Sequence, residues 1–71
     1  MRSTTAGEYR AVLAAAAQAA TLPAGERRRI VGRLRRELHR IAARDHFPPP
    51  EREQAHAAVA DLATRTAEAA R

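Results

Sequence analysis

Large apolar side chains are scarce in this chain, and their scarcity limits the folds that it can adopt. Of its 71 residues 45% are hydrophobic, but nineteen of these are alanine and only thirteen are larger. Burying a large aliphatic side chain contributes roughly 1.5–3 kcal/mol, whereas ordering each residue costs on the order of 1.5 kcal/mol. The sequence has no cysteine, so disulfides and thiolate metal sites cannot compensate. We therefore expect one small domain whose helices pack closely through alanine.

Two breaks marked by proline divide the chain into three predicted helices. Pro23 is typical of a first helical position and biases its predecessor away from helix. Pro48, Pro49 and Pro50 remove three consecutive backbone donors and end the preceding helix. The predicted helices are residues 5–20, 23–45 and 50–69, after a disordered tail at residues 1–4. Thr5 and Glu8 have the spacing of a capping box at the start of the first helix.

Apolar residues recur at three- and four-residue steps, which predicts one buried stripe on each helix. The fold class is therefore all-α: a three-helix antiparallel bundle, or a helical hairpin with a packed first helix. In the turn before the third helix, Asp45, Phe47 and Pro50 are expected to be structural, with Phe47 closing the end of the hairpin. The predicted core comprises Tyr9, Val12, Leu13, Leu22, Ile30 or Val31, Leu34, Leu38, Ile41, Phe47, Val59 and Leu62.

Every basic residue is arginine, and the formal net charge is +5. Between Arg27 and Arg44 there are eight arginines and one acid, Glu37. Arg28 and Arg35 flank one side of the second helix. At about 100° per residue, the face opposite the apolar stripe carries five arginines, which form the predicted binding site for an anionic partner: Arg29, Arg33, Arg36, Arg40 and Arg44.

Three interpretations of this arginine face remain open. It could contact a nucleic-acid phosphate backbone, with an affinity that falls steeply with salt. It could pair bidentately with the carboxylates of an acidic protein. It could also be a solvated face, which the acids of the third helix partly balance, in a chain whose alanine and arginine reflect GC-rich codons. Neither aromatic residues nor Asn or Gln occur on this face, so base stacking and sequence-specific reading are not expected.

Nothing in the sequence predicts a catalytic residue, a metal site or a cofactor. His39, His46 and His56 lack the spacing of zinc ligands. A glycine-rich phosphate loop, a cysteine nucleophile and lysine are absent, and Ser3 is the only serine. We therefore expect a protein that is not an enzyme.

Hydropathy gives an expectation for location. No apolar stretch approaches the roughly 20 residues of a transmembrane helix. The alanine-rich run at residues 11–20 is too short for a signal-peptide core and lacks a basic leader. We expect a cytoplasmic protein without a membrane partner.

The stretch from Leu34 to Phe47, LRRELHRIAARDHF, is followed by Pro50 and an alanine-spaced helix. It resembles the helical second half of the N-terminal domain of ChrB, the chromate-resistance regulator family. In that family a long charged helix ends in an Arg-Asp-aromatic-Phe turn, with a proline three residues later. The residues that match are Arg44, Asp45, Phe47 and Pro50. Glu8 and Tyr9 also resemble the start of the family's preceding helix, so the resemblance covers about residues 8 to 65.

The chain departs from the family pattern in two ways. Glu37 stands where the family commonly has tryptophan, and His46 where it has a second aromatic residue. The family's β-rich, winged-helix-like segment and its chromate-response domain have no counterpart in these residues. The resemblance therefore implies the helical part of a transcriptional regulator, and DNA binding cannot be carried over from the family.

These observations predict a regulatory or accessory helical module that binds an anionic partner through the arginine face. An acidic protein or a second copy is the first expectation for the partner. The alternatives are a non-specific nucleic-acid-binding protein and a truncated remnant of a larger regulator without independent activity.

Overall fold

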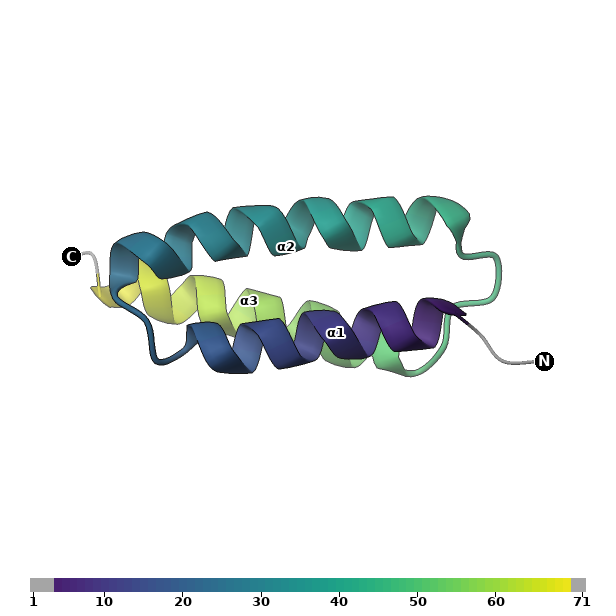
Figure 1. The fold of residues 1–71 in the computed structure, drawn as a ribbon, viewed down its shortest axis with the longest axis horizontal. Coiled ribbons are helices and arrows are strands. Elements are labelled where there is room, and N and C mark those ends of the chain that lie inside the picture. Colours follow the sequence, from purple (N-terminus) through teal and green to yellow (C-terminus); the bar gives the residue numbers. More distant parts are fainter. Residues whose placement is uncertain (1–3, 70–71) are drawn as a thin grey trace.

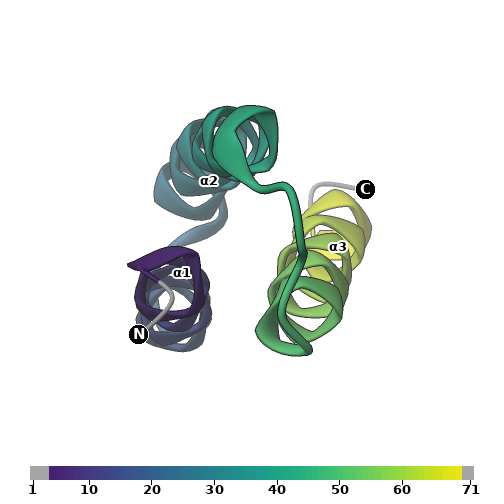
Figure 2. The ribbon, with the colours of Figure 1, turned by 90° about the vertical axis from the view of Figure 1, so that its right-hand side faces the viewer.

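Three helices form the chain in the computed structural model, which describes residues 4–69. They are α1 (Thr4–Ala19), α2 (Ala24–Arg44) and α3 (Glu51–Ala69). Successive helices run in opposite directions along a body of 44 × 18 × 15 Å (Figure 1). Each helix packs against both others, and Figure 2 shows α2 at the apex of a triangle over α1 and α3. The predicted all-α fold is confirmed, and it is the three-helix bundle.

The helix boundaries differ from the predicted ones by at most one residue. Pro23 is the N-cap of α2, with extended backbone (φ −60°, ψ 156°), and its carbonyl accepts the Arg27 N–H at 2.9 Å. α2 ends where Asp45 becomes extended, and the Asp45 N–H donates to the Ala42 carbonyl at 3.2 Å. Of the predicted tail, Thr4 belongs to α1 and residues 1–3 lie outside the described residues.

The core contains one apolar stripe from each helix, as predicted. Tyr9 and Ile41 are its largest fully buried side chains, and alanines at the interior let the helix backbones approach closely. Leu13, Leu22 and Ile30 are half-buried and pack against this core, so Val31 and not Ile30 is the buried member of that pair. The buried apolar residues are Tyr9, Val12, Ala16, Ala19, Val31, Leu34, Leu38, Ile41, Ala55, Val59 and Leu62.

The prediction that Phe47 belongs to the core is wrong. Its side chain is 90% exposed. It lies between two helix ends, and Pro48 restricts the backbone of the residue before it to extended conformations. Tyr9, which is fully buried and contacts Asp45, already fills this end of the bundle. The turn therefore closes without help from the aromatic ring.

Replacing a core residue should lower the stability of the protein far more than replacing Phe47. Ile41→Ala leaves a cavity and should lower the free energy of unfolding by about 2–5 kcal/mol, and Ile41→Val by about 0.5–1.5 kcal/mol. Phe47→Ala should change it by less than about 0.5 kcal/mol, because the ring is already in water. Urea unfolding followed by circular dichroism measures all three. A loss for Phe47→Ala as large as that for Ile41→Val would contradict the exposed position of the ring.

Candidate anion-binding surface

The five arginines of the predicted face lie on the solvent side of α2, but their surroundings differ. All five are exposed. Arg40 Nη2 lies 3.6 Å from Glu37 Oε1 one turn away, and Arg44 forms an ion pair with Glu8 on α1. The others have no carboxylate partner among the described residues: Arg29, Arg33 and Arg36.

Two arginines that the sequence placed beside the predicted face are equally free. Arg28 and Arg35 are exposed and have no ion-pair partner within residues 4–69. The sequence indicated them only through the high density of arginine in this helix. Their position on the helix did not reveal that they lack carboxylate partners. We define the α2 ridge as the exposed arginines of α2 without a described carboxylate partner: Arg28, Arg29, Arg33, Arg35 and Arg36.

Arg27 has a structural role instead. It is only partly exposed, and its guanidinium donates to the Ala20 carbonyl at 3.4 Å, just after the end of α1. Its Nε is buried without a hydrogen-bond partner. Cationic side chains commonly bond the free carbonyls at helix C-termini. We therefore leave Arg27 out of the ridge.

The acids of α3 do not neutralise α2. α2 carries eight arginines and two glutamates, a net charge of +6, whereas α3 has a net charge of −2. Glu51 pairs with Arg10 of α1 at 3.1 Å, and Asp61 pairs with Arg65 within α3 at 2.9 Å. In the part of the chain that the structure describes, no carboxylate of α3 forms an ion pair with an arginine of α2.

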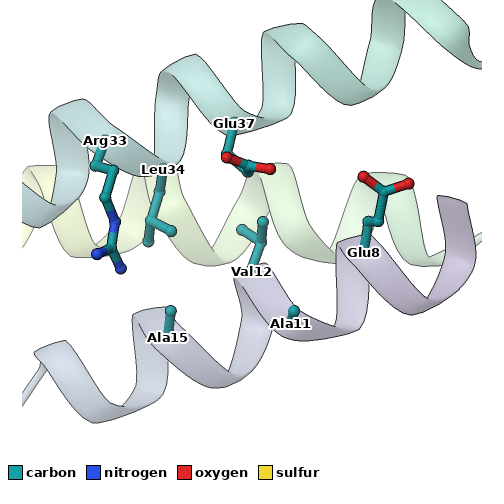
Figure 3. A pocket seen from close by; sticks show the side chains of 7 residues that line it. All are labelled: Glu8, Ala11, Val12, Ala15, Arg33, Leu34 and Glu37. Atoms are coloured by element: carbon teal, nitrogen blue, oxygen red, sulfur yellow. The ribbon is translucent and has the colours of Figure 1, made fainter.

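Grooves on either side of α2 show that the ridge has two flanks. The groove toward α1 has a volume of about 380 Å³, and Figure 3 shows Arg33, Leu34 and Glu37 of α2 facing α1 across it. Its α1 wall consists of Glu8, Ala11, Val12 and Ala15. The groove toward α3, about 160 Å³, is lined by Arg28, Val31, Arg35, Ala63, Thr66 and Ala67. Ridge arginines thus border both neighbouring helices.

Asp45 connects the turn between α2 and α3 to the start of α1. Its carboxylate accepts hydrogen bonds from the Thr5 hydroxyl at 3.4 Å and the Tyr9 hydroxyl at 3.3 Å. A structural role was predicted for Asp45 in this turn, but its hydrogen bonds to Thr5 and Tyr9 were not. Burial raises the pKa of the Tyr9 hydroxyl above its usual 10.0, and the charge of Asp45 together with its hydrogen bond raises that pKa further.

Ion pairs reinforce the same end of the bundle. Glu8 pairs with Arg44, and α1 begins at Thr4, one residue before the predicted cap at Thr5. The pair of Arg10 with Glu51 joins α1 to the first residue of α3. The acids at this end therefore hold the helices together and are not available to the ridge.

No described group of three His, Asp or Glu side chains could hold a metal ion. His39, His46 and His56 are all exposed. Within residues 4–69 no helix is both long and apolar enough to cross a membrane.

No family model, curated protein or solved structure matches this chain. The resemblance to the ChrB family therefore stays a prediction.

The single tyrosine allows a direct test of the Asp45 contact. The chain has no lysine or cysteine, so Tyr9 is the one side chain that ordinarily titrates near pH 10. Its raised pKa means that the folded state holds this proton more tightly than the unfolded state. The stability that this group contributes is complete below about pH 10 and is lost as the pH rises through the folded-state pKa.

Absorbance of the tyrosinate should therefore appear above pH 10.0 in the folded chain. In the Asp45→Asn variant it should appear at lower pH than in the unchanged protein. The loss of stability in this range should disappear in Tyr9→Phe. Ionisation of folded Tyr9 at or below its usual pKa would contradict the burial of its hydroxyl, and the same pKa in Asp45→Asn as in the unchanged protein would show that the contact with Asp45 is absent in solution.

Proposed function

We propose that this chain is a non-enzymatic regulatory or accessory module that binds an anionic partner through the α2 ridge. The observation that carries the proposal is that five arginines within residues 28–36 are exposed and have no carboxylate partner among residues 4–69. Like charges four residues apart, such as Arg29 and Arg33, repel by a few tenths of a kcal/mol each. An anionic partner removes this repulsion and adds charge-assisted hydrogen bonds.

Counting the free acids favours a different molecule over a second copy as the source of negative charge. Among the described residues, three acids are exposed and lack an ion-pair partner: Glu26, Glu53 and Glu68. Three carboxylates cannot neutralise the five arginines of another copy's ridge. Association through these charges alone would leave part of the ridge unpaired.

The geometry of the grooves supports a binding role over catalysis. Catalysis by side chains requires an acid, base or nucleophile held in a site that excludes water. The groove between α1 and α2 is lined by four apolar residues and by Glu8, Arg33 and Glu37. Both of its carboxylates are partly exposed to water, and each forms an ion pair with an arginine. The regulatory part of the proposal rests on the resemblance of residues 34–47 to the ChrB family, and a cytoplasmic location on the hydropathy of the sequence.

Binding to two unrelated polyanions tests this proposal. We expect labelled mixed-sequence DNA duplex, polyglutamate, or both, to bind at about 50 mM salt and to weaken steeply by about 200 mM. For the duplex, the double variant Arg33→Gln/Arg36→Gln should lower the slope of log affinity against log salt by about two. Fluorescence anisotropy measures the affinity, and circular dichroism checks that the helices persist.

The matched control removes the same charge from another face. Arg10→Gln/Arg65→Gln changes arginines of α1 and α3 that already have carboxylate partners. Its salt slope should stay close to that of the unchanged chain. Equal losses in the two double variants would mean that net charge alone drives binding, and failure to bind either polyanion would refute the proposal.

A further inference from the structure

The surroundings of the α2 ridge bear on the chemistry of its partner, and this inference rests on the proposed function. Protein–protein interfaces gain most of their affinity from buried aromatic and aliphatic anchors at their centre. Among the described residues, Phe47 is the only exposed large hydrophobic side chain, and it lies in the turn beyond the C-terminal end of α2. Among the described residues, no large apolar side chain is exposed between the arginines of the ridge. Protein–DNA interfaces have this character, since they are more polar and much more positive than protein–protein interfaces.

A single-stranded nucleic acid fits the ridge poorly. Proteins that bind single strands stack the bases on aromatic side chains beside a basic groove. α2 offers one ring, the exposed imidazole of His39 beside Arg35 and Arg36, and Tyr9, the one aromatic residue of α1, is fully buried. One imidazole can stack one base. The other bases along the ridge would have to stack on arginine planes that also bind phosphates. A double strand, whose bases are already stacked, needs only the phosphate contacts.

The shape of the ridge matches a groove between two rows of phosphates. Arg33 borders the α1 side of α2, Arg28 and Arg35 border the α3 side, and Arg36 lies between them on the outer surface. From Arg28 to Arg36 the helix rises about 12 Å. α2 forms one corner of the triangle of helices, above α1 and α3 (Figure 2). A helix roughly 10–12 Å in diameter fits the B-DNA major groove, which is about 12 Å wide.

We infer that the α2 ridge binds B-form double-stranded DNA, with α2 in the major groove and its two arginine flanks on the phosphates of opposite strands. The A-form groove of duplex RNA is too narrow and deep for this entry. α2 has no Asn or Gln to read adenine, and its arginines can favour only guanine. Phosphate contacts carry no sequence information, so binding is nearly independent of sequence.

Three duplexes with equal numbers of phosphates test the inference. The first is mixed-sequence DNA, the second is RNA of the same sequence, and the third is the DNA with bulky C5 substituents on its pyrimidines, which fill the major groove. At equal salt, the unmodified DNA should bind at least about tenfold more tightly than either of the others, because groove entry adds contacts that both of them prevent. A minor-groove ligand should not displace the protein.

Variants of the two flanks test contact with both strands. Arg33→Gln on the α1 side and Arg35→Gln on the α3 side should each lower the salt slope by about one, and together by about two. Arg65→Gln, the control of equal charge on α3, should leave the slope unchanged. If only one flank affects the slope, α2 lies along a single strand and the inferred groove binding is wrong.

The outcomes separate this inference from the proposed function. Equal affinity for the three duplexes would overturn groove entry and keep a general polyanion site. Tighter binding of polyglutamate than of DNA would overturn the nucleic-acid partner and keep an acidic protein as the partner. Only the failure of every polyanion to bind would overturn both.

Discussion

Close packing of alanine against a few large side chains holds the three helices together, and the surface of the protein follows from this constraint. Ala16, Ala19 and Ala55 are buried among the larger residues and let the backbones approach. The large apolar side chains of the described helices are all buried or half-buried in this packing. The solvent side of α2 is consequently free of large apolar groups, so arginine can occupy it without disturbing the core.

Local patterns were sufficient to predict the helices and most of the core. Proline positions define where a helix can begin, and the 3.6-residue period selects one face of each helix. The burial of Phe47 was predicted wrongly, because a hydrophobic side chain is buried only where its backbone lets it reach the interior. Pro48 restricts the backbone of Phe47, and Tyr9 already fills that end of the core. The place of Tyr9 depends on how α1 lies against the turn, which the pattern of a single helix does not contain.

The sequence predicted which face of α2 carries the arginines, but not which of them lack a carboxylate partner. Angular position on an isolated helix groups Arg44 with Arg29 and Arg33. It contains no information about neighbouring helices, so it did not reveal that Arg44 has a carboxylate partner. In the bundle Glu8 of α1 pairs with Arg44 of α2, and Glu51 at the start of α3 pairs with Arg10 of α1. Such pairs between helices determine which arginines stay free. Arg28 and Arg35 joined the ridge for the same reason, since α3 offers them no carboxylate.

The arginines without a carboxylate partner lie nearer the N-terminus of α2 than the paired ones do. Arg28 and Arg29 follow directly after the first turn of α2, where the helix dipole contributes about half a positive charge. Glu26 is the one acid in that first turn. By contrast, Arg40 and Arg44, toward the favourable C-terminal end, have carboxylate partners. Three of the ridge arginines, Arg28, Arg29 and Arg33, thus lie in the N-terminal half of α2, and Arg35 and Arg36 lie just past its middle.

A small core tolerates this arrangement only while the apolar stripe on the other side of α2 outweighs it. An anion bound at the ridge would interact favourably with these arginines. A ligand that binds the folded chain more tightly than the unfolded one stabilises the folded state. A partner at the proposed site would therefore stabilise the bundle to the extent that it needs the arginines in their folded arrangement.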